Sequence, residues 1–200
     1  MNFDRRRFLG SFVAGAAGIA IAPRAFATAL TDNTPALLPR AIAALQYHAH
    51  SIPNRDVIGL VDFSSPSRDT RFKIVDVLSG RVISRHLVAH GSGSDPANSG
   101  WLQRFSNVPG SNASSPGSFV TGQTYYGKHG RSRRLIGLDP ENSLALPRNI
   151  VIHGASYVND DIANNSGRVG RSQGCFAVSR GEIDHVLEML GPGRLLFAAK

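Results

Sequence analysis

The sequence has one cysteine among its 200 residues, and only 18% of the residues are charged. A single cysteine excludes an internal disulfide bond and any zinc or iron–sulfur site built from several cysteines. The hydrophobic fraction, 42%, is too high for a disordered chain. Length and composition therefore predict one ordinary globular domain, and 21 glycines with 11 prolines favour strands and turns over a helical bundle.

Long apolar runs are also lacking, and the N-terminal apolar stretch at residues 9–22 is too short to span a membrane. It follows the segment Asp4-Arg-Arg-Arg-Phe-Leu9, which resembles a twin-arginine export signal, and it precedes Ala25-Phe26-Ala27, which fits a small-x-small cleavage site. The alternative is a basic amphipathic helix. We expect residues 1–27 to be a signal peptide, and the mature protein to reach the periplasm without a stable membrane anchor.

Residues 1–27 contain four arginines and one aspartate, so the formal net charge of +8 falls to +5 for the mature chain. A moderately basic exported protein is suited to anionic surfaces such as acidic lipids or cell-wall polymers with free carboxylates. The sequence has no basic run and no ordered set of aromatics, and this excludes a typical nucleic-acid-binding protein.

Apolar periodicity and turn residues predict the elements of the mature chain. A helical pattern lies within residues 35–50, so we divide the chain into an N-terminal helical segment (28–54) and a main domain (55–200). The expected fold is α+β and mainly β, with largely antiparallel sheets and a few helices. Strands are expected at residues 57–63, 72–78, 82–88, 135–138, 149–153 and 194–199, and a helix from the capping box Ser179–Glu182 to Leu190.

Residues 91–130 are rich in Gly, Ser, Asn and Pro, and predict a long loop that forms an ordered lid or binding wall. Aromatic residues in this loop would either stack on a sugar or peptide or, as we prefer, pack in the core. We expect the basic side chains that follow to form a solvated face, and two histidines to lie on the surface. These residues are Trp101, Tyr125 and Tyr126; Arg131, Arg133 and Arg134; and His129 and His185.

Two short stretches carry residues suited to nucleophilic chemistry. An apolar strand ends in His153-Gly154, and a glycine-containing turn leads to Cys175. A neighbouring imidazole can take the proton of a thiol, and the glycine before the cysteine frees backbone N–H groups to face an oxyanion. The alternatives are a small buried cysteine and a strand-end histidine without a catalytic role.

Together, His153-Gly154 and Ser172-Gln173-Gly174-Cys175 resemble the His-Gly … Ser-x-Gly-Cys signature of the L,D-transpeptidase (YkuD-like) catalytic domain. The segments 88–93 and 105–111 are similar to a murein L,D-transpeptidase-like subgroup. The resemblance covers roughly residues 57–199, and it implies a mixed, largely β fold with the nucleophile near a strand end, under a loop flap.

For the site, the resemblance implies that Cys175 attacks the diaminopimelate carbonyl of a peptidoglycan stem tetrapeptide and releases D-Ala, before transfer to an amine. His153 would be the base, the carbonyl of Gly154 would orient its ring, and the N–H groups of Gly174 and Cys175 would form the oxyanion hole. No cofactor or metal is implied, and we expect a monomer. The residues expected to contact substrate are Ser172, Gln173, Arg171, Tyr157 and His90.

The sequence departs from the family pattern at two positions. Gln173 stands where many members have His, and Ala177 where they commonly have Arg or Asn. His153 is therefore the only expected base, and we expect it to depress the pKa of the Cys175 thiol. Without that Arg or Asn, the clamp for the substrate carboxylates stays open among Arg168, Arg171 and Arg180. Two other functions also stay open: an L,D-carboxypeptidase that uses water as acceptor, and a catalytically idle peptidoglycan-binding protein.

Overall fold

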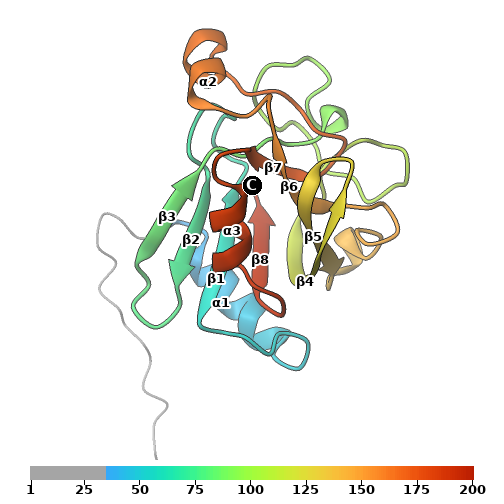
Figure 1. Cartoon of the computed structure of the whole chain (residues 1–200). Helices are drawn as coiled ribbons and strands as arrows, with labels where there is room; N and C mark the ends of the chain where they lie inside the picture. The colour runs from blue at the N-terminus through green and yellow to red at the C-terminus, as the bar shows by residue number, and fades with distance from the viewer. Residues whose placement is uncertain (1–34) are drawn as a thin grey trace, which may run out of the picture.

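The computed structural model describes residues 35–200 (Figure 1). The predicted signal peptide and the first residues of the predicted N-terminal segment lie outside this range. The helices are α1 (Leu38–Tyr47), α2 (Asp160–Ser166) and α3 (Ile183–Met189), with short 3₁₀ turns η1 (Ser92–Ser94) and η2 (Pro140–Asn142). The strands are β1 (Val57–Asp62), β2 (Phe72–Asp76), β3 (Val82–His86), β4 (Gly117–Gly127), β5 (Gly130–Gly137), β6 (Val151–Ala155), β7 (Phe176–Ser179) and β8 (Leu195–Ala199).

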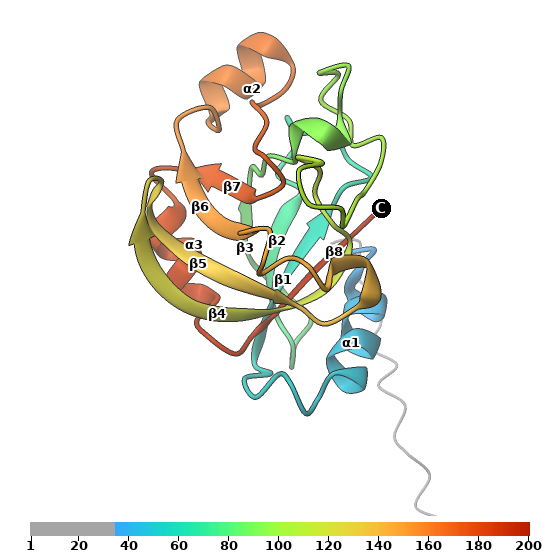
Figure 2. The same ribbon diagram turned by 90° about the vertical axis from the view of Figure 1, so that its right-hand side faces the viewer.

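The strands form one mixed sheet in the order β3-β2-β1-β8-β4-β5-β6-β7. The last strand, β8, lies in the middle, parallel to β1 and antiparallel to β4, and β6 and β7 are also parallel to each other. The remaining neighbours are antiparallel, as the sequence predicts. The β4–β5 hairpin is strongly curved in Figure 2, and its register shifts between Thr121 and Thr124. A bulge of this kind bends a strand and increases its twist.

Helices cover both faces of the sheet. Side chains alternate along β8, so that Leu196 packs on the side of α3 and Leu195 on the side of α1. Figure 2 shows the two helices on opposite sides of the sheet. Because both of its faces are covered, every residue of β8 is buried. A membrane-spanning helix is not found in residues 35–200, since no helix there is long and apolar enough.

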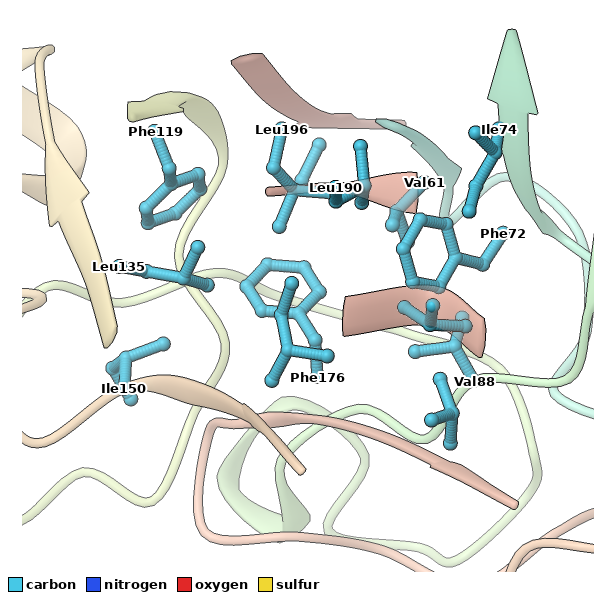
Figure 3. Close-up of a cluster of buried hydrophobic side chains, with 14 of the residues drawn as sticks. Val61, Phe72, Ile74, Val88, Phe119, Leu135, Ile150, Phe176, Leu190 and Leu196 are labelled. Carbon is cyan, nitrogen blue, oxygen red and sulfur yellow. The ribbon is translucent and has the colours of Figure 1, made fainter. Parts of the chain in front are cut away.

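The cluster under α3 places the cysteine turn. Phe176, which follows Cys175, is fully buried at the centre of this cluster in Figure 3, near Phe119 and Leu135. Its ring centroid lies 5.5 Å from that of Phe119, in an edge-to-face arrangement. The residue after the thiol is therefore anchored in the tightly packed core.

The structure corrects three predictions of secondary structure. The segment 91–130 is not one loop, because β4 and the start of β5 lie within it; the glycines and serines around Phe119 and Val120 concealed a strand. Helix α2 was not predicted. The capping box at Ser179 and Glu182 is not formed: α3 begins at Ile183 without a side-chain cap, and the Glu182 carboxylate lies 3.0 Å from Nδ1 of His86.

Two predictions about side chains are also wrong. Trp101 is 48% exposed and Tyr126 is 82% exposed, so neither packs in the core. Arg133 does not belong to a solvated face. It is buried, and its guanidinium donates hydrogen bonds to the carbonyls of Gly122 and Leu187. Strand β5 turns this side chain toward α3, where backbone carbonyls replace water around the charge.

Candidate functional site

A cavity with a volume of about 710 Å³, which we call the main cavity, lies in the described part of the chain. It lies between the loop that precedes β4, the tip of the β4–β5 hairpin, the start of β6 and the turn that precedes β7. Most of the site residues predicted from the sequence line it. They are Cys175, His153, Ser172, Gln173, Arg171 and Tyr157.

His153 lies on β6, where its side chain is buried. Its Nδ1 lies 3.0 Å from the carbonyl oxygen of Gly154. A carbonyl can only accept, so Nδ1 carries the proton, and Nε2 of the neutral ring is left as a base. Burial lowers the pKa of His153 below its usual value, and the nearby His129 and Lys128 lower this pKa further. The imidazole is therefore neutral at neutral pH.

Cys175 is half-buried directly before β7. Parallel pairing aligns Ile152 of β6 with Phe176 of β7, which brings the cysteine to the same end of the sheet as His153. The thiol donates a weak hydrogen bond to the carbonyl of Asn149, with a sulfur–oxygen distance of 3.5 Å.

The groups around the Cys175 thiol shift its pKa in opposite directions. Burial raises the pKa of Cys175, and this outweighs the N–H of Val151 and the positive charges of Lys128 and Arg148, which lower it. The expectation that His153 depresses the pKa of the thiol is therefore not met. The thiol and the imidazole are therefore both neutral at rest, because burial would deprive a thiolate of its hydration.

The turn before Cys175 requires glycine at position 174. Gly174 has a φ of 113°, and a Cβ there would lie 2.7 Å from the carbonyl oxygen of Ala113. The Ser172 hydroxyl holds this turn: it accepts from the N–H of Gly174 at 3.1 Å and donates to the carbonyl of Cys175 at 2.7 Å. The N–H of Gly174, which the sequence assigns to an oxyanion hole, is thus occupied in the resting structure.

The turn is also fixed to the segment after β3. Ser172 donates its N–H to the carbonyl of His90 and accepts from the N–H of Ser92, at 2.9 and 2.8 Å. A Cβ on Gly91 would lie 2.8 Å from the nitrogen of Gly174, so the two glycines allow two backbones to pass at close range.

His90 is a correction to the predicted substrate contacts. It does not line the cavity; its ring is buried between two charged side chains. Nδ1 accepts from the guanidinium of Arg71 at 2.7 Å, and Nε2 donates to the carboxylate of Asp95 at 3.3 Å. Burial, with the charge of Arg71, lowers the pKa of His90 to about 4, so the ring is a neutral bridge between them.

The sequence profile of the L,D-transpeptidase catalytic domain matches residues 31–199. The chain belongs to this family. Its fold, with the candidate cysteine and histidine at neighbouring strands, is the L,D-transpeptidase catalytic fold. No curated protein sequence is significantly similar to the chain.

Three solved structures that resemble this one are distant from it in sequence. The chain is 17% identical to an L,D-transpeptidase from Xylanimonas cellulosilytica, with 80% of this chain and 70% of the other covered and a TM-score of 0.44. It is 13% identical to an L,D-transpeptidase from Mycobacterium smegmatis and 11% identical to the helical cell shape determining protein Pgp2 from Campylobacter jejuni, each over 72% of this chain. Their TM-scores are 0.45 and 0.46, and the match covers 59% and 48% of their lengths.

Among the candidate arginines, this L,D-transpeptidase domain places Arg171 at the main cavity, where its guanidinium donates to the backbone carbonyl of Asp95. Arg180 lines a smaller neighbouring cavity, and Arg168 lines neither of the two. Sequence reasoning missed Arg148, which also lines the main cavity. Its guanidinium binds backbone and hydroxyl oxygens of the loop before β4: Ser106, Ser111, Ala113 and Ser115.

Sequence reasoning also placed His129 on the surface without a role. The residue is exposed, but it lies at the tip of the β4–β5 hairpin and lines the main cavity beside His153. No local sequence signal predicts this contact, because it depends on the curvature of the hairpin. In residues 35–200, no group of three or more His, Cys, Asp or Glu side chains is arranged to hold a metal ion.

Proposed function

We propose that this domain is a cysteine-dependent peptidoglycan L,D-transpeptidase that acts in the periplasm through a thioester on Cys175. The observation that carries the proposal is that Cys175 and the neutral base His153 line one cavity, in a chain that belongs to the L,D-transpeptidase family. The cavity, at about 710 Å³, is large enough for a peptide.

In the first half-reaction, Nε2 of His153 takes the thiol proton as the sulfur of Cys175 attacks the diaminopimelate carbonyl of a stem tetrapeptide. The tetrahedral intermediate collapses, the bond to the terminal D-Ala breaks, and His153 returns the proton to the leaving amine. A thioester and free D-Ala result.

In the second half-reaction, the amine of an acceptor stem attacks the thioester. His153 takes a proton from this amine and gives it to the departing thiolate, so that the enzyme is restored and a cross-link is formed. Lys128 and Arg148 favour the thiolate that appears in both half-reactions. The N–H of Cys175 is the remaining candidate for the oxyanion, since Ser172 engages that of Gly174.

The surroundings of the cavity support an anionic substrate. Lys128, Arg148 and Arg171 line it, and no aspartate or glutamate does. Stem peptides carry free carboxylates, which cationic side chains attract. We therefore expect Arg171 to contact the substrate, together with Gln173 and Tyr157, which line the same cavity.

Mass spectrometry of the purified protein incubated with disaccharide-tetrapeptide tests the proposal. We expect a covalent adduct that lacks D-Ala, together with cross-linked dimers, and neither product from the Cys175→Ser variant. Tripeptide without dimers would assign the protein as an L,D-carboxypeptidase. Folded protein that gives no adduct and no product would overturn the enzymatic function and favour a peptidoglycan-binding role.

A further inference from the structure

The catalytic candidate His153 is in face-to-face contact with a second imidazole. The ring centroids of His129 and His153 are 4.1 Å apart, and their planes differ by 19°. Every other aromatic contact in the described residues is tilted or edge-to-face. The stack therefore covers one face of the buried imidazole with a side chain from a different strand pair.

The hairpin tip is held in this place from two sides. Ser132 is aligned with His153 across β5 and β6, and its hydroxyl donates to the carbonyl of Gly130 at 3.1 Å. Gly130 closes the turn with a φ of 77°, a conformation that favours glycine. On the outer side, Arg131 donates to the carboxylate of Asp184 on α3 at 2.8 Å. The hairpin is thus attached both to β6 and to α3.

The imidazole of His153 needs such support, because its hydrogen bond within residues 35–200 runs from Nδ1 to the carbonyl of the next residue. One bond at one edge of a ring limits rotation about the Cβ–Cγ bond but leaves the opposite edge, with Nε2, without a partner among residues 35–200. Gln173, on the cysteine turn, has no aromatic ring with which to cover the imidazole face. A flat ring packed against that face restricts the remaining tilt.

We propose that His129 is a positioning residue for the proposed transfer reaction, and that its stacked ring fixes the plane of the His153 imidazole, from which Nε2 takes the proton of the thiol. This inference rests on the proposed function. His129 acts through the face of its ring and not through its nitrogens, which form no hydrogen bond within residues 35–200. The charged groups around it, Lys128, Arg131, Arg180 and Asp184, line the smaller cavity of about 430 Å³ with it.

The first test separates the ring face from the nitrogens. We compare the rate of adduct formation in the His129→Ala and His129→Phe variants, with His50→Ala, an exposed histidine on the chain after α1, as the matched control. The Ala variant is expected to lose a factor on the order of ten to a hundred in kcat, with KM little changed. The Phe variant is expected to recover most of this loss. A Phe variant as slow as the Ala variant would overturn the proposal, as would an Ala variant as fast as wild type.

The second test does not require activity. Nitrogen-15 NMR of labelled histidine reports which ring nitrogen of His153 carries the proton, and at which pH the ring titrates. In wild type we expect one tautomer with the proton on Nδ1; in His129→Ala we expect a mixture, which His129→Phe restores to one form. Unchanged His153 signals in the Ala variant would overturn the positioning role. Altered signals in a protein that forms no adduct would leave that role in place and reject the proposed function instead.

Discussion

Nδ1 of His153 lies 3.0 Å from the carbonyl oxygen of Gly154, the next residue in the chain. In many hydrolases and acyltransferases a carboxylate orients the imidazole; here a backbone carbonyl does so without adding a negative charge. A neutral acceptor does not stabilise the imidazolium as strongly as a carboxylate would. Burial lowers the pKa of the ring and outweighs the hydrogen bond to Gly154, which raises it, so the resting imidazole is neutral.

The first prediction concerns the acid limb of the reaction. Because burial lowers the pKa of His153 below its ordinary value of 6.5, the ring remains a base at mildly acidic pH. The kcat/KM for adduct formation should therefore fall only as the pH drops below 6.5. His153→Ala should lose on the order of a hundredfold or more. An acid limb centred above pH 7 would contradict the lowered pKa.

The second prediction concerns the resting thiol. Burial raises the pKa of Cys175, so alkylation by iodoacetamide should keep accelerating beyond about pH 8.5, the midpoint of an ordinary cysteine. Lys128→Ala should move the midpoint still higher, because a positive charge that favours the thiolate is removed. Unfolded protein in denaturant provides the reference curve. A plateau reached below pH 7 would instead show a thiolate–imidazolium pair at rest.

Local sequence signals were sufficient for the parts of the site that are themselves local. The apolar strand that carries His153 and the glycine turn before Cys175 could be predicted, because each is encoded by consecutive residues. The strand does not end at His153, however, since β6 continues to Ala155. His90 could not be placed, since its partners Arg71 and Asp95 come from separate segments. The same holds for His129, whose contact depends on a bulge in β4 far from the tip.

The fold shows a similar division. Runs of β-forming residues bounded by turn residues predicted β1 and the β2–β3 hairpin, and a last strand at residues 194–199 predicted β8. The longest strand, β4, was missed, because its first half is buried and its second half is exposed and polar. Such a strand has no constant period, and only its pairing with β5 and β8 reveals it.

The third prediction tests the glycine of the cysteine turn. Gly174→Ala should destabilise the fold by at least about 2 kcal/mol, because the left-handed φ is strained and the new Cβ meets the carbonyl of Ala113. Gly110→Ala is the matched control: its φ of 77° is also left-handed, but nothing lies within 4 Å of the new Cβ, and a cost of about 1 kcal/mol is expected. Urea unfolding measures both. Equal losses would show that the close contact contributes nothing.

The fourth prediction concerns Arg148, which joins the start of β6 to the loop before β4. Arg148→Met should increase amide exchange in residues 105–116, because four oxygen acceptors in that loop each lose one donor. The same change should raise the midpoint of thiol alkylation, since a cation near Cys175 is lost. Arg168→Met, at a half-buried position outside both cavities, is the control. Exchange that is unchanged in the loop would contradict this role.

The fifth prediction concerns the stability of the fold at acidic pH. Burial, with the charge of Arg71, lowers the pKa of His90 from 6.5 to about 4. The unfolded chain therefore binds a proton at His90 near pH 6.5, whereas the folded chain does not until about pH 4. The stability that depends on neutral His90 is complete above pH 6.5 and is lost as the pH falls toward 4. The loss amounts to about 3 kcal/mol at 1.36 kcal/mol per pKa unit.

Urea unfolding between pH 7.5 and pH 4 measures this loss. His90→Gln keeps an acceptor for Arg71 and a donor for Asp95 but cannot titrate, so its stability should fall less steeply than that of wild type over the same range. The comparison uses slopes, because Gln also changes the packing of a buried site and so the stability at every pH. His50→Gln, on an exposed side chain, should keep the wild-type slope. If the slope of His90→Gln equals that of wild type, protonation of His90 is not the cause of the loss of stability. The hydrogen bonds of His90 with Arg71 and Asp95 would then not be what the acid breaks.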